Sequence, residues 1–483
     1  MLHRFWTQGR LPAPTTTLVL AVLAGAAGAA TLVDRRLGIG AAALGVLLWA
    51  PAVPTLLGRR AWRDLAMAGL TVGLVAMVAV RDAGWVLALC LTVATWTGAV
   101  AATSARSAPA VLASAATAAL GGLRASAWAV RGAGALVGTR RGRLLTGLRS
   151  VGVTAVLLLV FGWLFVSADR VFASYLPTVE VASLPAQVVV GTLVALGAAT
   201  VAHLVLVTPE WSDVRLPAGR PAGRAEWLLP VLALGALVVA FVLVQLGALI
   251  GGHRYVLETT GVTYAQYARE GFGQLVVATA LTLLVIAVAA RRAPTATAAD
   301  RLVARAALGV LCVGTLGVVA SALRRMDLYM EAFGWTRLRV FVVLVEVVLG
   351  AVLVLVLVAG AVRRYGWLPT AAVHVVGVAA IALAVANPDA MIVRHNVSAD
   401  LENGLDVSYL AGLSADAVPA MAELDEPLRS CLLAQVDVGA HSGVEWNLAR
   451  QEAAEALVTW DPVVGDVARR GDGTKAPCSS SGR

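Results

Sequence analysis

Long apolar stretches, separated by short polar segments, fill this chain as far as Asn387. A helix needs about 20 largely apolar residues to cross the hydrocarbon core of a bilayer, because each residue adds about 1.5 Å. The stretches that approach or exceed this length are 15–33, 37–57, 65–81, 83–102, 151–168, 184–207, 227–250, 272–290, 303–323, 339–361 and 368–387. The pattern predicts an all-α fold, a polytopic α-helical membrane bundle with about 11 transmembrane helices.

Two apolar segments allow a second interpretation. Residues 107–123 are rich in alanine and only weakly hydrophobic, so we expect a helix at the membrane surface, with an additional span as the alternative. Residues 15–30 follow a basic start and contain small residues at which a signal peptide could be cleaved. We favour an uncleaved first span, and cleavage would leave the remaining topology unchanged.

A polar region follows the last apolar stretch and predicts short helices. Apolar residues become periodic after Pro388; Ser414 is expected to cap one helix with Asp416 in its first turn, and 426–436 and 444–460 predict two more. We divide the chain into an N-terminal membrane region with four spans and a basic cytoplasmic segment, a membrane domain with seven spans, a soluble helical C-terminal region and a disordered tail. These are residues 1–150, 151–387, 388–465 and 466–483.

The composition agrees with a membrane protein. Apolar residues make up 59% of the chain and charged residues 14%, and the mean hydropathy is +0.81. An ordinary globular chain is about half apolar and about a quarter charged. The lipid bilayer is therefore the first predicted partner.

The positive charge predicts how the bundle is oriented. The net charge of +9 is carried almost wholly by arginine, and most arginines lie in clusters between the apolar stretches. Positive charge in such positions faces the cytoplasm, so nucleic-acid binding is not expected. The arginine bias predicts a cytoplasmic N-terminus and an extracytoplasmic C-terminal region, and the arginine-rich, alanine-rich composition is typical of a bacterial plasma-membrane protein encoded in a GC-rich genome.

Four arginines on the predicted outer side are exceptions to this rule: Arg324, Arg325, Arg337 and Arg339. We expect partners to hold them. Acidic residues of the outer loops and anionic lipid headgroups are the candidates, the acidic ones being Asp327, Glu331 and Glu270.

Ionisable residues inside the membrane are candidate sites, because insertion of a charged side chain costs about 2.5–3.5 kcal/mol. Glu346, in the run FVVLVEVVLGAVL, is the clearest candidate. It is either a proton or cation site or a neutral acid bonded to a neighbouring helix. His374 is the second candidate, and nothing in the sequence brings the two together.

Aromatic and charged residues share the outer loops and form a candidate outer-face cluster. An interfacial belt that anchors short helices at the headgroups is the alternative. A protein partner is a further possibility for this face. The cluster comprises Asp169, Tyr264, Tyr267, Arg269, Glu270, Arg325, Asp327, Tyr329, Glu331, Asn387, Asp389, Arg394 and Asn396.

Local motifs for cofactors and metals are missing. The chain has no G-x-x-x-x-G-K-[ST] run and no paired histidine or C-x-x-C motif, so we expect no cofactor and no metal site. Cys90 and Cys312 lie in apolar stretches, as packing residues do. Cys431 and Cys478 can pair only in an oxidising compartment.

Four polar runs resemble those of a bacterial, mainly actinobacterial, family of multi-pass membrane proteins, the group of domains of unknown function 4153 and 4173. The runs are SADRVF, TYAQYAREGF, RRMDLYMEAFGWTRLR and NPDAMIVRHN, and the resemblance covers roughly residues 150–460. It implies a similar order of spans, outer loops and C-terminal helices, and no established activity. Gln266 stands where we expect an acidic residue, which argues against a carboxylate role there.

Three functions are compatible with the sequence. The first is a non-enzymatic scaffold, sensor or partner-binding protein with an extracytoplasmic working face. The second is a secondary transporter that uses Glu346, although no inverted repeat is recognisable. The third is an outer-face enzyme that acts on lipid-linked substrates through loop carboxylates and arginines.

Overall fold

The described part of the chain is helical throughout. The computed structural model describes residues 12–168, 183–209, 211, 214, 223–260, 272–294, 296–434, 436, 438–439 and 442–458. Ten helices in these ranges are long and apolar enough to cross a membrane. They belong to α2 (Thr15–Leu32), α5 (Trp62–Ala76) with η1 (Met77–Ala79), α6 (Gly84–Thr103), α7 (Ala108–Ala168), α9 (Leu184–Leu206), α10 (Arg224–Thr260), α12 (Phe272–Arg292), α13 (Ala298–Phe333), α14 (Arg337–Val362) and α15 (Leu368–Ala386). The predicted all-α membrane bundle is confirmed, with ten candidate spans where the sequence predicted about 11.

One predicted span, 37–57, is broken in the structure. It forms the short helices α3 (Ile39–Trp49) and α4 (Val53–Gly58), with Pro51 in the break and Pro54 in the first turn of α4. Proline lacks an amide hydrogen and its ring clashes with the preceding helical turn, so it ends α3 early. The 11 residues of α3 extend only about 16 Å, well short of a hydrocarbon core of about 30 Å.

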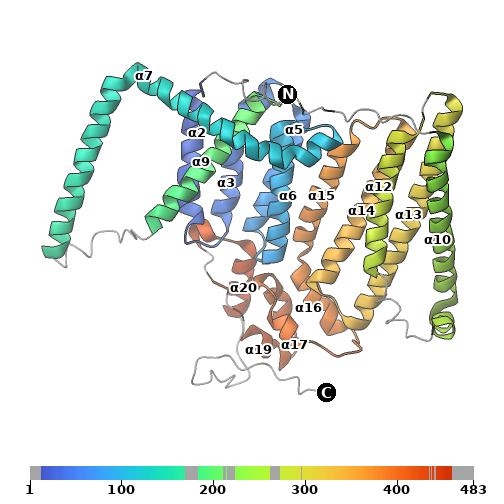
Figure 1. Ribbon diagram of the computed structural model, residues 1–483. Coiled ribbons are helices and arrows are strands. Elements are labelled where there is room, and N and C mark those ends of the chain that lie inside the picture. Colours follow the sequence, from blue (N-terminus) through green and yellow to red (C-terminus); the bar gives the residue numbers. More distant parts are fainter. Residues whose placement is uncertain are drawn as a thin grey trace.

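Two segments that the sequence separated form one helix. α7 contains both the predicted surface helix 107–123 and the predicted span 151–168, and it continues through the proposed boundary at residue 150. By length and composition its first part, Ala108–Leu136, is one of the ten candidate spans, but Figure 1 shows this part crossing one end of the bundle, in the direction expected for a surface helix. There, Trp211 donates a hydrogen bond to the Thr117 hydroxyl at 3.0 Å.

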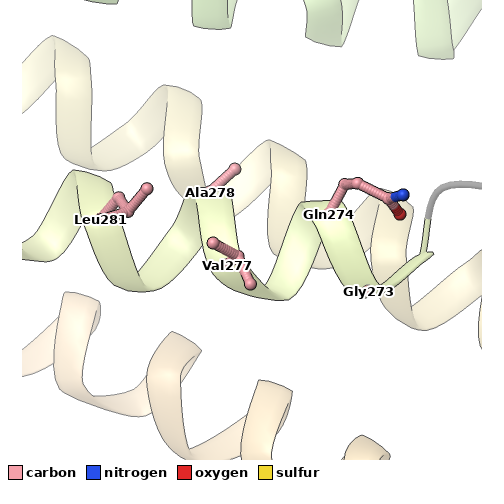
Figure 2. Close-up of a pocket in the computed structure, with 5 residues that line it drawn as sticks. All are labelled: Gly273, Gln274, Val277, Ala278 and Leu281. Carbon is pink, nitrogen blue, oxygen red and sulfur yellow. The ribbon is translucent and has the colours of Figure 1, made fainter.

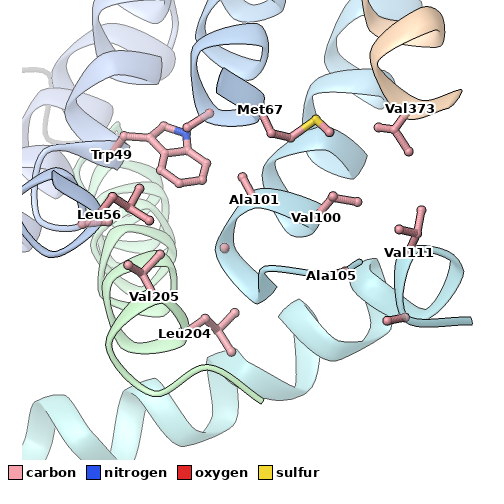
Figure 3. Close-up of a cluster of buried hydrophobic side chains, with 14 residues drawn as sticks. Trp49, Leu56, Met67, Val100, Ala101, Ala105, Val111, Leu204, Val205 and Val373 are labelled. Atoms are coloured by element: carbon pink, nitrogen blue, oxygen red, sulfur yellow. The ribbon is translucent and has the colours of Figure 1, made fainter. Parts of the chain in front are cut away.

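The long helices form two groups joined by α15. One group contains α2, α3, α5, α6 and α9, and the other contains α10, α12, α13 and α14; α15 packs against both α6 and α14 (Figure 1). Figure 3 shows the core of the first group near the end that α7 crosses, where Trp49, Leu56 and Met67 meet Leu204 and Val205. Helices distant in sequence therefore share one core.

The C-terminal residues close the opposite end of the bundle (Figure 1). We call Pro388–Val458 the C-terminal cap. Its elements are α16 (Pro388–Ser398), α17 (Val407–Ala411), η4 (Ala415–Ala417), α18 (Val418–Ala422), α19 (Leu428–Leu433), η5 (Gly443–Glu445) and α20 (Leu448–Val458). Ile392, Leu410 and Met421 are fully buried in one core that also includes Val340 and Leu383 from the bundle. The cap is thus packed onto the bundle through apolar contacts.

Small residues allow α2 and α9 of the first group to approach each other closely. A Cβ added to Gly25 would lie 2.6 Å from the backbone oxygen of Gly191 and 2.9 Å from Cβ of Ala195. Such pairs let membrane helices pack backbone to backbone. By contrast, Gly69 has open space around it.

We expect Gly25→Ala to destabilise the protein by about 1–3 kcal/mol, because the methyl group forces α2 and α9 apart. The matched control is Gly69→Ala, which should be neutral or slightly stabilising, since alanine favours the helix by up to about 1 kcal/mol. Thermal unfolding of the purified proteins in one detergent measures both. Equal melting temperatures for the two variants would contradict the close α2–α9 contact.

Candidate functional site

The most polar buried region of the described chain lies where the C-terminal cap meets the bundle. The turns between α2 and α3, between α5 and α6 and between α13 and α14 reach this end, and α15 ends here at Asn387. Asn387 adopts a left-handed conformation with φ 55°, and its side-chain oxygen accepts the amide hydrogen of Ala390 at 3.2 Å. The chain therefore turns sharply from α15 into α16 and places Asp389 inside the junction.

Asp389 is fully buried and is surrounded by donors from three parts of the chain. Arg337 binds both carboxylate oxygens, Nε at 3.0 Å from Oδ1 and Nη2 at 2.5 Å from Oδ2. Trp85 donates to Oδ1 at 3.1 Å, and Ser414 donates to Oδ2 through its amide at 3.1 Å and its hydroxyl at 2.7 Å. The two-pronged arginine contact is the strong, directional form of an ion pair.

A second buried carboxylate, Asp416, lies next to the first. Its Oδ2 accepts the amide hydrogens of Asp82 at 2.8 Å and Ala83 at 2.6 Å, and Arg81 approaches Oδ1 at 3.5 Å. The Ser414 hydroxyl is 3.1 Å from Oδ2, so one hydroxyl lies between both carboxylates. Asp416 therefore fixes the turn that leads into α6 through the two backbone amides that precede the helix.

The last cap helix is tied to the same turns. Arg450, which is almost fully buried, donates to Asp82 Oδ1 at 2.6 Å and to the backbone oxygen of Leu37 at 2.8 Å. The Asn447 side chain donates to the backbone oxygens of Val78 at 2.9 Å and Arg81 at 2.8 Å. These bonds connect α20 to both the α2–α3 turn and the α5–α6 turn.

A third set of contacts fixes the turn between α13 and α14. Asn396 pairs with the backbone of Trp335, accepting from its amide at 2.6 Å and donating to its oxygen at 3.0 Å. Arg339 donates to the Tyr329 hydroxyl at 3.0 Å and stacks over that ring at 4.2 Å. The amide of Arg337 donates to the Tyr409 hydroxyl at 2.8 Å.

The structure shows how the four exceptional arginines are held. Arg337 and Arg339 have the partners just described, Arg324 pairs with Asp327 at 2.6 Å, and Arg325 donates to Gln245 at 3.1 Å. Asp327 was among the predicted counter-charges. The buried counter-charge, however, is Asp389, which the sequence did not pair with any arginine.

The predicted outer-face cluster is only partly assembled. Asn387, Asp389 and Asn396 make hydrogen bonds at the junction, and Tyr329 accepts one from Arg339 beside the α13–α14 turn. Glu331 is exposed, Asp327 is half exposed, and Arg394 makes only an exposed 3.7 Å ion pair with Glu423. Asp169, Tyr264, Tyr267, Arg269 and Glu270 lie outside the described residues.

Sequence reasoning missed several residues of the junction: Asp82, Trp85, Ser414 as a ligand of Asp389, Asn447 and Arg450. Ser414 was expected to cap its own helix, but its side chain makes no capping bond and instead contacts Asp389 and Asp416. The signal that was present is the charged pair Arg81-Asp82 in the tight turn between two predicted spans. Its partners could not be found, because they lie more than 300 positions away.

The intramembrane candidates are not paired with each other. Glu346 is fully buried on α14, where Thr279 of α12 donates to its Oε1 at 3.2 Å and Oε2 has no hydrogen-bond partner among the described residues. His374 contacts the backbone oxygen of Thr370 one turn earlier on α15, at 2.8 Å. Among the described residues, no group of three His, Cys, Asp or Glu side chains could hold a metal ion.

A groove on the surface of α12 does not add a polar site. Figure 2 shows its lining, which comes from one face of that helix: Gly273, Gln274, Val277, Ala278 and Leu281. Binding sites for polar molecules need several converging polar groups, and this groove has one. It is the kind of surface that faces lipid.

The two junction carboxylates have pKa values displaced in opposite directions. Burial alone would raise the pKa of Asp389, but the bonds and charge of Arg337, together with Ser414, outweigh it and hold the pKa below the ordinary value. For Asp416, burial outweighs the two backbone amides and Arg81, and the pKa lies above the ordinary value. The junction thus prefers Asp389 ionised and resists ionisation of Asp416.

Comparison with known proteins gives a family. The profile of the family described as "Domain of unknown function (DUF4153)" matches residues 66–424. The chain belongs to this family. The matched range of DUF4153 begins in α5 and ends just after α18, so it contains Asp82, Arg337, Asp389 and Asp416 but stops before α20. No curated protein and no solved structure matches the chain.

We expect Asp389→Asn to destabilise this DUF4153 protein by about 3 kcal/mol, since removal of one partner leaves the charge of Arg337 uncompensated in a largely buried site. The exposed pair Arg394–Glu423 provides the control: Arg394→Gln should cost less than about 1 kcal/mol. Thermal unfolding and limited proteolysis of the C-terminal cap measure the two variants. Similar small effects in both would refute the central role of Asp389.

The two carboxylates should also give opposite pH dependences. A depressed pKa in the folded state means that Asp389 stabilises above its unfolded value of about 3.9, so the difference between wild type and Asp389→Asn should shrink as the pH falls below about 4. A raised pKa means that Asp416 stabilises most below about 3.9, so the advantage of wild type over Asp416→Asn should shrink as the pH rises. Unfolding midpoints measured between acidic and neutral pH test both slopes; parallel slopes would contradict the assignment.

Proposed function

We propose that this integral membrane protein is a non-enzymatic scaffold, sensor or partner-binding protein, whose working face is the C-terminal cap with the turns that it covers. The observation that supports the proposal is that the junction carboxylates already accept hydrogen bonds from protein groups. Asp389 is fully buried and has five donor contacts, and both Asp416 and Arg450 are at most 2% exposed. A general acid or base must reach its substrate, whereas these groups reach only the protein.

A rigid cap suits recognition. The junction fixes the cap to turns from both helix groups, which removes the freedom that a tethered tail would have. Binding to a preorganised surface avoids the entropic cost of ordering it. Asp425 and Glu423 lie on the exposed side of the cap and offer charges to a protein partner, while the surrounding bilayer and its anionic headgroups contact the bundle.

Two observations support an extracytoplasmic position for this face. The arginine bias of the loops favours a cytoplasmic location for the opposite end, which includes Arg59 and Arg106. In addition, Cys431 in the cap is disulfide-bonded, and disulfides form and persist in oxidising compartments. We therefore propose a bacterial plasma-membrane protein with its N-terminus in the cytoplasm.

A secondary transporter is the second candidate, and one observation favours it. Glu346 is fully buried inside the bundle, and within the part of the chain that the structure describes its Oε2 has no hydrogen-bond partner. An intramembrane carboxyl group of this kind is suited to proton binding. Against this, the groove on α12 is apolar, and Thr279 is the one hydrogen-bond donor that contacts Glu346 among the described residues.

The proposal can be tested with two variants that each add one exposed cysteine to the native chain, Asp425→Cys on the cap and Arg364→Cys in the turn before α15. Intact cells are treated with a membrane-impermeant maleimide that carries a photo-cross-linker. We expect labelling of Asp425→Cys only, and, on illumination, one discrete protein adduct that disappears when Asp389→Asn is added. Labelling of Arg364→Cys instead would reverse the topology, and labelling of the cap without a protein adduct would reject the partner-binding role.

The competing function needs a separate measurement. Wild type and Glu346→Gln are reconstituted into vesicles that contain a pH-sensitive dye, and a membrane potential is imposed. The binding-protein proposal expects the same proton flux in both preparations. A flux that is present in wild type and lost in Glu346→Gln would favour the transporter.

A further inference from the structure

We propose that the first helix group binds one acyl chain of a glycerophospholipid in a cavity between α3, α5, α6 and α9. The cavity has a volume of about 440 Å³. This lies within the range of about 300–1,000 Å³ that small-molecule sites occupy. It is separate from the junction and from Glu346, and its occupant is independent of the function proposed above.

Small residues of α3 and α6 alternate with large apolar side chains in the cavity wall. α3 contributes Ala41 and Gly45 to the wall, and α6 contributes Ala94 and Gly98. A Cβ at Gly98 would lie 3.3 Å from a methyl group of Thr71 and 3.8 Å from the Trp49 ring, so a larger side chain there would narrow the space.

The dimensions match a chain from one leaflet. On α6 the wall runs from Leu91 to Ala102, which is about 16 Å along the helix axis. Half of a hydrocarbon core of about 30 Å is about 15 Å. A single acyl chain therefore fits lengthwise, whereas an isoprenoid that exceeds one leaflet does not.

The polar groups of the wall are already satisfied by the protein. Thr71 donates to the Met67 oxygen at 3.0 Å, Thr95 donates to its own helix at 2.7 Å, and Thr200 donates to the Leu196 oxygen at 2.6 Å. Water in a cavity needs two to four polar partners, and a polar ligand needs at least as many. An apolar occupant therefore suits this wall, because it restores the van der Waals contacts that the lining residues lack when the cavity is empty.

The cavity is closed at its ends and opens at its side. Leu37 and Val78 line the end near the C-terminal cap, where their backbone oxygens are held by Arg450 and Asn447. Leu204 lines the other end, beneath α7. Thr95 lines the cavity and is exposed on the bundle side, so a chain enters from the surrounding lipid.

Two threonines on α6 provide a matched test. Thr92 and Thr95 are both exposed and both bonded to their own helix, but Thr95 lines the cavity and Thr92 does not. Each full-length variant is reconstituted in phospholipid vesicles that contain a trace of phosphatidylcholine with a diazirine near the end of one acyl chain. After illumination, adducts are mapped by mass spectrometry.

We expect wild type and Thr92→Phe to carry adducts on 41–49 and 91–102, and Thr95→Phe to lose them. Size-exclusion profiles and melting temperatures check folding, and Thr95→Leu replaces Thr95→Phe if the larger ring prevents assembly. Equal labelling of these segments in all variants would overturn the proposal. Displacement of the label by decaprenyl phosphate, but not by unlabelled phosphatidylcholine, would overturn the assignment to a phospholipid chain.

Discussion

The rest of the structure depends on the buried ion pair between Arg337 and Asp389. A carboxylate removed from water loses several kcal/mol of solvation, which is recovered only when its oxygens are fully bonded. Arg337, Trp85 and Ser414 supply those bonds from the start of α14, the start of α6 and the cap. Because one carboxylate can be satisfied only if all three segments are in place, it couples the two helix groups to the cap.

The second carboxylate extends this coupling without a comparable charge partner. Asp416 is held mainly by two backbone amides at the start of α6, and burial raises its pKa. Its neighbour Ser414 has one hydroxyl hydrogen for two carboxylates, so the two sites share a donor. Polar networks of this kind specify a unique arrangement when every member is bonded.

The helices of the bundle are held together by different interactions, because apolar helices in lipid gain little from burial against each other. Packing between them depends on close backbone approach, as at Gly25 and Gly191, and on gaps where small residues meet no large partner. The cavity beside α3, whose wall mixes small and large apolar side chains, is one such gap. A membrane protein can keep it because lipid chains are available to fill it, whereas in a water-soluble core it would be a loss of contacts.

The sequence alone determined the fold class, the positions of most spans and the presence of a polar C-terminal region, because span length and hydropathy act locally along the chain. Nine of the eleven predicted stretches correspond to long candidate spans or parts of them outside α7. Pro51 and Pro54 are visible in the sequence, but the prediction of one span over 37–57 did not take them into account. The break between α3 and α4 follows directly from the local chemistry of proline. The four arginines that were exceptions to the predicted orientation also indicated that partners were needed.

Only the tertiary structure decided which partners those are. Asp389 follows Arg337 by 52 positions and Arg450 follows Asp82 by 368, and no periodicity or spacing connects such residues. The direction of α7, the placement of α9 beside α2 and the cavity beside α3 were likewise beyond reach. Local hydropathy fixes where a helix lies in the bilayer, but its neighbours are chosen by the shape and charge of side chains that the chain brings together only when it folds.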